Sequence, residues 1–121
     1  MSNPNIVDVT SILGKTSYVH VSTSPTIIIS NENESNKVYK INTIIVSNTD
    51  NGNEADVSLY YNETGSAENY YIAKTMDVSA DSNISLITKN TSIYLEENCN
   101  LVIISSADDH LDAIISYEII S

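Results

Sequence analysis

The sequence is poor in the residues that build disulfide-stapled domains and phosphate-binding loops. Its 121 residues include no tryptophan, no phenylalanine, one cysteine, two prolines and three glycines. A single cysteine excludes an intrachain disulfide, which is the main support of small secreted domains. Three glycines leave almost no room for a glycine-rich phosphate loop, and no nucleophile elbow or paired-carboxylate pattern is present. We therefore expect a protein that is not an enzyme and that has no catalytic residues and no cofactor.

Positive charge is also scarce. Five lysines and no arginine stand against sixteen acidic residues, which gives a formal net charge of −11. So few cations cannot neutralise a run of phosphates, so neither nucleic acid nor an anionic membrane surface is an expected partner. No stretch approaches the roughly 18 apolar residues of a membrane span, and the first residues lack the pattern of a signal peptide. We expect synthesis in a reducing cytoplasm.

What is present favours β-structure. Isoleucine, valine and tyrosine dominate the apolar residues, and serine, threonine, asparagine and aspartate lie between them. The first group suits a pleated sheet and the second suits its turns. Polar breaks divide the chain into about eight or nine strands. We predict one all-β domain over residues 1–121, a single antiparallel β-sandwich that is jelly-roll-like, with an immunoglobulin-like Greek key as the alternative. Residues 1–14 are expected to form an N-terminal strand or arm.

The alternation of apolar and polar residues predicts which side chains form the core. In the longest segment, residues 37–48, the pattern places Ile41 and Ile45 inward and Ile44 and Val46 outward. The whole predicted core comprises Val19, Val21, Ile41, Ile45, Val57, Leu59, Ile72, Ile84, Leu86, Leu101, Ile103, Ile115 and Tyr117.

Three segments, 37–48, 101–107 and 111–120, carry apolar residues on both faces. Soluble monomers avoid large exposed apolar patches, so the outer faces are predicted to pack against another chain, either a copy or a different protein. An alternative is that a loop or the N-terminal arm covers these strands. Glu118 is expected at the rim of the contact, where it selects a cationic partner. The candidate interface residues are Ile44, Val46, Val102, Ile104, Ile114, Glu118 and Ile120.

The remaining polar candidates have simpler interpretations. His20 lies in mid-strand and is expected to be a structural or surface residue. His110 lies in an acidic turn, residues 108–112, without the second ligand of a zinc site. Residues 48–56 loosely resemble a calcium loop but read better as a hairpin turn whose side chains bond their own backbone. No metal site is assigned, and calcium binding by either loop stays open. Acidic neighbours are expected to raise the pKa of Cys99.

Two long strings carry a resemblance to a known group of proteins. They are "KVYKINTIIVSNTDNGNEADVSLYY" (37–61) and "KNTSIYLEENCNLVIISSADDHLDAIISYEIIS" (89–121), with the features "INTIIVSN", "ADV", "SIYLEE" and "SYEIIS". The chain resembles small virion structural proteins of marine tailed phages, including those of cyanobacteria, over most of residues 37–121. The resemblance implies a non-enzymatic particle component located in the virion, without a cofactor, made in the host cytoplasm.

Three hypotheses follow from the sequence. The first is a capsid decoration or another subunit of the particle surface, which associates with itself or with other virion proteins. The second is a neck, tail or baseplate adaptor. The third is a carbohydrate- or receptor-binding module, for which outward tyrosines would supply stacking surfaces.

Overall fold

The computed structural model describes residues 11–121, and nearly all of these residues lie in strands or in the short loops that join them. Their only helical segment is a single 3₁₀ turn, so the predicted all-β fold is confirmed. The elements are β1 (Ile12–Val21), β2 (Thr26–Asn31), β3 (Val38–Asn48), β4 (Ala55–Glu63), β5 (Asn69–Val78), β6 (Asn83–Ile87), η2 (Lys89–Thr91), β7 (Ile93–Leu95), β8 (Cys99–Ser105) and β9 (Leu111–Ile120).

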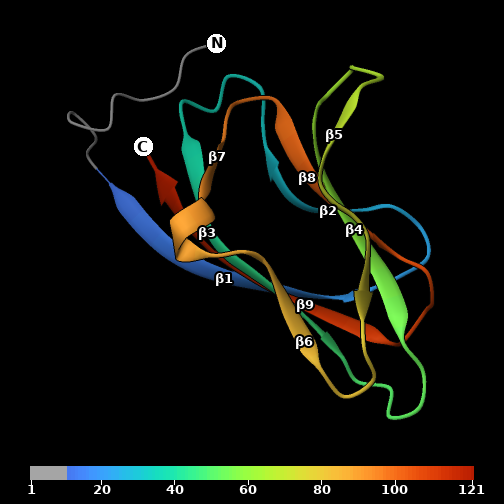
Figure 1. Cartoon of the computed structure of the whole chain (residues 1–121). Helices are drawn as coiled ribbons and strands as arrows, with labels where there is room; N and C mark the ends of the chain where they lie inside the picture. Colours follow the sequence, from blue (N-terminus) through green and yellow to red (C-terminus); the bar gives the residue numbers. More distant parts are fainter. Residues whose placement is uncertain (1–10) are drawn as a thin grey trace.

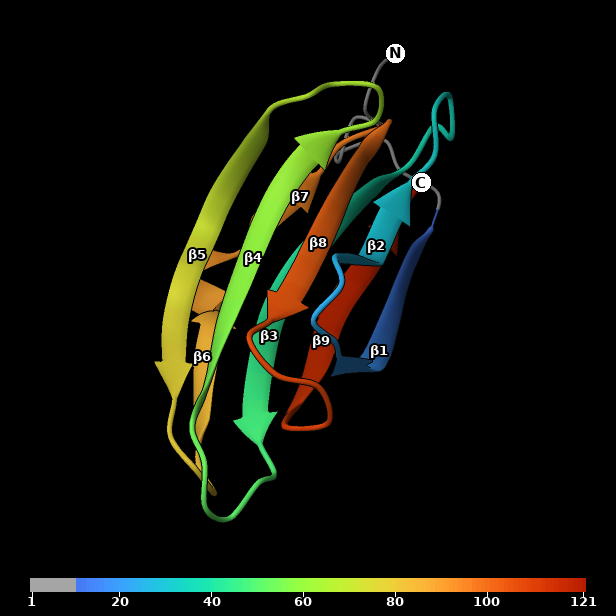
Figure 2. The same ribbon diagram turned by 90° about the vertical axis from the view of Figure 1, so that its right-hand side faces the viewer.

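The strands form two antiparallel sheets that face each other, as Figure 2 shows. Sheet A has the order β1-β9-β3-β6, and β7 also pairs with β3, in line with β6 rather than side by side with it (Figure 1). Sheet B has the order β2-β8-β4-β5. With β7 set aside, the pairing is nested: β1 with β9, β2 with β8, β3 with β6, and β4 with β5. A long hairpin wound into two sheets in this way is a jelly roll.

A β-bulge in β3 decides which of its residues enter the core. The pairing of β3 with β9 shifts between Ile41 and Thr43, so Asn42 is an extra residue. Such a residue breaks the strict alternation of a strand. Ile41 and Ile44 are therefore both fully buried although they are three residues apart. Beyond the bulge the phase is reversed, and Ile45 points outward.

The core contains most of the predicted residues. Val21, Ile41, Val57, Leu59, Leu101, Ile103 and Ile115 are buried, and Val19, Ile84, Leu86 and Tyr117 pack partly buried against them. The prediction is wrong for two residues, Ile45 and Ile72, which are exposed. Ile45 follows the bulge in β3. Ile72 is the unpaired residue of another bulge, in the edge strand β5, between the residues that pair with Leu59 and Tyr60.

The first described strand is longer than the sequence indicated. The predicted N-terminal strand or arm ends at residue 14, but Gly14 lies within β1, opposite Glu118 of β9. The strand–arm boundary predicted at residue 14 is therefore wrong, because pairing with β9 carries β1 through the glycine. The rest of the predicted N-terminal arm, residues 1–10, lies outside the described residues.

Two buried asparagines join the sheets, one at each end of the sandwich. Asn31 of β2 donates from Nδ2 to the carbonyls of Lys37 (2.8 Å) and of Leu95 in β7 (3.1 Å). Asn48 of β3 donates from Nδ2 to the carbonyls of Asn53 and of Val78 in β5, both at 2.9 Å. Each amide thus satisfies a carbonyl of the opposite sheet that would otherwise be buried without a partner.

Candidate interaction surface

Three apolar side chains lie in a row across the outward surface of sheet A, which we call the A face. Tyr18 of β1 pairs with Ile114 of β9, and Ile114 pairs with Ile45 of β3. Side chains that are directly opposite in an antiparallel sheet are in contact range. They are nevertheless open to solvent, with exposed fractions of 81%, 50% and 38% for Tyr18, Ile114 and Ile45. The three side chains thus form an exposed apolar row on this face.

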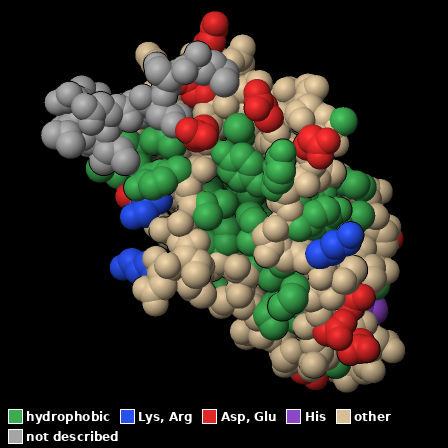
Figure 3. All heavy atoms as spheres, turned by 45° about the horizontal axis from the view of Figure 1, so that its top comes forward, with side chains coloured by type: hydrophobic (Ala, Val, Ile, Leu, Met, Phe, Trp, Pro, Cys, Tyr) green, Lys and Arg blue, Asp and Glu red, His purple; other side chains and the backbone are tan. Residues whose placement is uncertain are grey.

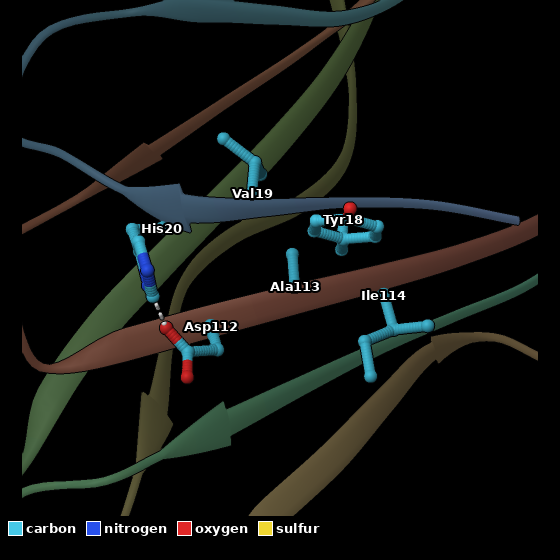
Figure 4. Close-up of a pocket in the computed structure, with 6 residues that line it drawn as sticks. All are labelled: Tyr18, Val19, His20, Asp112, Ala113 and Ile114. Carbon is cyan, nitrogen blue, oxygen red and sulfur yellow. Dashed lines mark hydrogen bonds and ion pairs between the residues drawn. The ribbon is translucent and has the colours of Figure 1, made fainter.

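A shallow hollow of about 450 Å³ lies beside this row, over the β1–β9 pair. Its lining includes His20 and Asp112, which point toward one another across the two strands (Figure 4). The His20 Nδ1 atom lies 2.5 Å from Asp112 Oδ1. This hydrogen bond, with the negative charge of Asp112, raises the pKa of His20 above its ordinary value. The expectation that His20 is a surface residue is confirmed, since its side chain is largely exposed.

The far end of the A face carries a second polar group. Glu118 of β9 lies opposite Lys40 of β3 in the register. Its Oε1 accepts a hydrogen bond of 3.0 Å from Nδ2 of Asn42, the bulge residue. Glu118 therefore already has a partner within its own chain, which reduces its capacity to select a partner from outside.

The structure corrects the candidate interface on β3. Ile44 and Val46 are completely buried in the core, so the prediction that they face outward is wrong. The bulge at Asn42 exchanges the two faces of the strand after this point. Ile45, which was expected in the core, takes their place on the A face.

The other candidate residues separate into two groups. Ile114 is exposed on the A face, as predicted. Ile120 lies in the same sheet between Ile12 and Val38 in the register, but it is only 3% exposed, so it is not available to a partner. Val102 and Ile104 lie in β8, which belongs to sheet B. One continuous interface through all the candidates is therefore excluded.

The outward surface of sheet B differs in chemistry from the A face. Val102 is buried there between Ile27 of β2 and Tyr60 of β4, its neighbours in the register. The ring of Tyr60 lies 5.3 Å, centroid to centroid, from the ring of Tyr71 in β5. The amino group of Lys74 lies over the Tyr71 ring. Ile104 is half-buried beside a smaller hollow on this surface.

A ladder of polar side chains runs beside that aromatic row. Ser30 Oγ donates to Asn100 Oδ1 at 2.7 Å, and Asn100 Nδ2 donates to Asn62 Oδ1 at 3.1 Å. Asn62 Nδ2 in turn donates to Asn69 Oδ1 at 3.2 Å. The ladder crosses all four strands of sheet B. This surface is thus polar and already hydrogen-bonded within the chain.

The flank formed by β5, β6 and β7 also exposes apolar side chains. Tyr70, Ile72 and Met76 of β5 and Tyr94 of β7 are exposed. Figure 3 shows hydrophobic side chains gathered along this side of the molecule, with acidic groups toward its ends. Among residues 11–121, strand β5 pairs only with β4, and its other edge has no paired strand.

Charge is distributed unevenly over the molecule. The strands of sheet A contain two acidic residues, Asp112 and Glu118, and two lysines, Lys15 and Lys40, so their formal charges cancel. The loops between the strands contain ten acidic residues. They are Glu32, Glu34, Glu68, Glu96 and Glu97 at one end of the sandwich, and Asp50, Glu54, Asp81, Asp108 and Asp109 at the other.

Backbone hydrogen bonds hold these loops together at each end. The amide of Asn98 donates to the carbonyl of Glu32, and the amide of Thr64 donates to the carbonyl of Asn98. At the other end, the amide of Asp81 donates to the carbonyl of Asp50, and the amide of Thr49 to that of His110. The sandwich therefore has two strongly acidic ends, whereas the A face carries Lys40 against Asp112 and Glu118, because Lys15 lies opposite Tyr117 on the core-facing side of β1.

The loop after β3 is not the hairpin turn that the sequence predicted, because β3 belongs to sheet A and β4 to sheet B, so the loop connects the two sheets. The predicted bonds from its side chains to its own backbone are nevertheless present. Asp50 Oδ1 accepts hydrogen bonds from the amides of Gly52 (2.8 Å) and Asn53 (3.0 Å), which lowers the pKa of Asp50. His110 Nε2 lies 3.1 Å from Asp50 Oδ2, so this turn contacts the 108–112 loop. Within residues 11–121, no three His, Cys, Asp or Glu side chains are arranged to hold a metal ion.

Cys99 is buried at the start of β8. Burial raises the pKa of its thiol, and the nearby charges of Glu63 and Glu96 act in the same direction, while a hydrogen bond with Tyr61 opposes them. The predicted direction is confirmed, but desolvation contributes more than the acidic neighbours. Such a thiol is a poor nucleophile at neutral pH.

Sequence reasoning missed two members of the A face, Tyr18 and Ile45. The signal for Ile45 was the pair of adjacent polar residues, Asn42 and Thr43, between two isoleucines. Two polar neighbours break the alternation and are typical of a bulge. No local signal identifies Tyr18 as a neighbour of Ile114, because 96 residues separate them along the chain.

Comparisons with known proteins support the fold and leave the family open. No protein-family model and no curated protein matches the chain. Among solved structures, it is similar to a protein of Bacillus endospore appendages, which are described as a novel family of disulfide-linked pili. The match has a TM-score of 0.51 and 14% identity, and it covers 91% of this chain and 87% of that chain. In the part of the chain that the structure describes, no helix is long and apolar enough to cross a membrane.

Proposed function

We propose that this chain is a non-catalytic structural subunit that works within a larger protein assembly. The observation that carries the proposal is the exposed apolar row Tyr18–Ile114–Ile45 on the A face. Ordered strands present these side chains, and the hollow beside them is shallow and mainly apolar, with His20 and Asp112 at its edge. Contact with a protein surface is the ordinary use of such a patch.

The sequence resemblance favours a tailed-phage virion as the assembly, with the chain on the capsid or another part of the particle surface. A neck, tail or baseplate adaptor would use the same surface. The pilus protein that is similar in fold is itself part of an assembly, which is consistent with this proposal. The disulfide linkage of that family is not carried over, because Cys99 is the single cysteine and is buried.

The environment of the two histidines supports a role without catalysis. Each ring contacts a carboxylate, His20 with Asp112 and His110 with Asp50. Among the described residues, neither ring is hydrogen-bonded to a serine, threonine or cysteine side chain that a histidine base would activate. The His20–Asp112 pair links β1 to β9, and the His110–Asp50 pair links the 108–112 loop to the turn after β3.

Localisation in intact particles tests this function. Cryo-EM of particles from an infected culture, with labelling by an antibody against this chain, is expected to place the chain at regular positions on a virion. Labelling of a host surface filament, with none on particles, would replace the phage assignment but keep the structural role. Only soluble, unassociated protein in the lysate would contradict the proposal.

Glycan binding is the second candidate, and the outward surface of sheet B favours it. Tyr60 and Tyr71 offer rings beside the ladder of Asn62, Asn69 and Asn100, and amides with neighbouring rings are groups that sugars use. A glycan-binding screen with and without calcium tests it. Binding that is lost in Tyr71→Ala but kept in Tyr18→Ala would support this candidate.

A further inference from the structure

A second strongly acidic chain meets less repulsion on the A face than at the ends of the sandwich. The A face carries Lys40 against Asp112 and Glu118, whereas five acidic residues lie in the loops at each end. Contact between the ends of two copies would bring these groups within a Debye length of about 8 Å at physiological salt. Contact through the A faces keeps the loops at the ends of the two A sheets about 10 Å apart, because packed sheets are about 10 Å from each other.

We infer that the occupant of the A face is a second copy of this chain, packed side by side through the row Tyr18–Ile114–Ile45. The inference rests on the proposed function and names the partner. Lys40 adds a cationic group to this face opposite Glu118 in the register, so an acidic partner finds both signs of charge there. Complementary charge of this kind sets the orientation of two surfaces more than their affinity.

The size of the face suits a contact weaker than a standard interface. Its main strands, β1, β9, β3 and β6, lie side by side, and β9 is ten residues long. Four strands about 4.8 Å apart and ten residues long make a surface of roughly 600 Å² before side-chain relief is added. A standard interface buries about 800 Å² on each partner. A reversible dimer is therefore the expected product.

Sedimentation velocity over a range of concentrations tests the inference with a matched pair of variants. Ile114→Lys places a charge in the centre of the A face, and Ile27→Lys places one on the outward surface of sheet B, at a residue of similar exposure. Both variants change the net charge from −11 to −10, so general repulsion falls equally. We expect Ile114→Lys to weaken association at least about tenfold, which is ~1.4 kcal/mol, and Ile27→Lys to leave it unchanged. Equal weakening by both variants would overturn the inference.

Cross-linking gives a second measurement that does not depend on a destabilising charge. In a Cys99→Ser background, Ser116→Cys places a thiol on the A face, and Ser30→Cys places one on sheet B. A short bis-maleimide is expected to link two copies of the first variant and not of the second. Suppose the wild-type chain is monomeric at millimolar concentration but joins an assembly of other proteins: the second-copy inference then fails and the proposed function stands. If it joins no assembly at all, both fail.

Discussion

His20 and Asp112 face one another across strands β1 and β9, with Nδ1 and Oδ1 2.5 Å apart. The hydrogen bond and the charge of Asp112 are the two main reasons for the raised pKa of His20, and the charge of Asp109 adds a smaller part. Because the folded-state pKa is above the ordinary value of 6.5, this pair contributes its full stability below pH 6.5. The contribution is lost as pH rises through the raised pKa.

The first prediction concerns this pair. Asp112→Asn is expected to lower the pKa of His20, because it removes both the charge and the strongest hydrogen-bond acceptor. Asp109→Asn is the control and should produce a smaller change in the same direction. An NMR titration of the His20 ring protons measures both. A pKa that does not respond to Asp112→Asn would show that the contact does not form in solution.

The second prediction tests the bulge at Asn42. Ile44→Ala is expected to lower the free energy of unfolding by about 2–5 kcal/mol, because it opens a cavity in the core. Ile45→Ala should cost less than about 1 kcal/mol, since Ile45 is on the surface. Urea unfolding followed by circular dichroism, at protein concentrations low enough to prevent association, gives both values. The reverse order of the two effects would mean that the strand has no bulge.

The third prediction concerns Asn48, which donates to one carbonyl of its own turn and to one of the opposite sheet. Asn48→Ala leaves the buried carbonyl of Val78 without a partner, which is expected to cost about 1–3 kcal/mol of unfolding free energy. Asn83→Ala in the exposed part of β6 is the control and should be nearly neutral. Thermal or urea unfolding measures the difference. Equal stability of the two variants would show that the hydrogen bond from Asn48 to the Val78 carbonyl does not stabilise the sandwich.

The fourth prediction concerns the thiol of Cys99. Because burial raises its pKa, we expect very slow reaction with a thiol reagent in the native protein at pH 8. Reaction should become fast in urea, over the same range in which circular dichroism records unfolding. Rapid labelling of the folded protein would show that this end of β8 opens locally.

The sequence was sufficient for the fold class because β-branched alternation is a local property. Segments such as 26–30 and 101–107 lie close to strands β2 and β8 for this reason. The faces of β3 were assigned wrongly because one extra residue, Asn42, reverses every side chain that follows it. The division of β8 and β9 between the sheets depends on pairing with distant strands, about which local alternation contains no information. The A face could therefore be recognised only from the structure, in which strand pairing brings Tyr18, Ile45 and Ile114 together.

The nested pairing also has a consequence for the order of events during synthesis. Strand β9 lies between β1 and β3, so these two strands have no shared partner until β9 has left the ribosome. Until then β1 pairs with no strand of its described sheet, and one edge of β3 lacks its neighbour. Pairings between residues so far apart in sequence form slowly. Sheet A is thus expected to be completed only after β9 has been translated. Before that point, another protein such as a chaperone would have to protect the unpaired strands from aggregation.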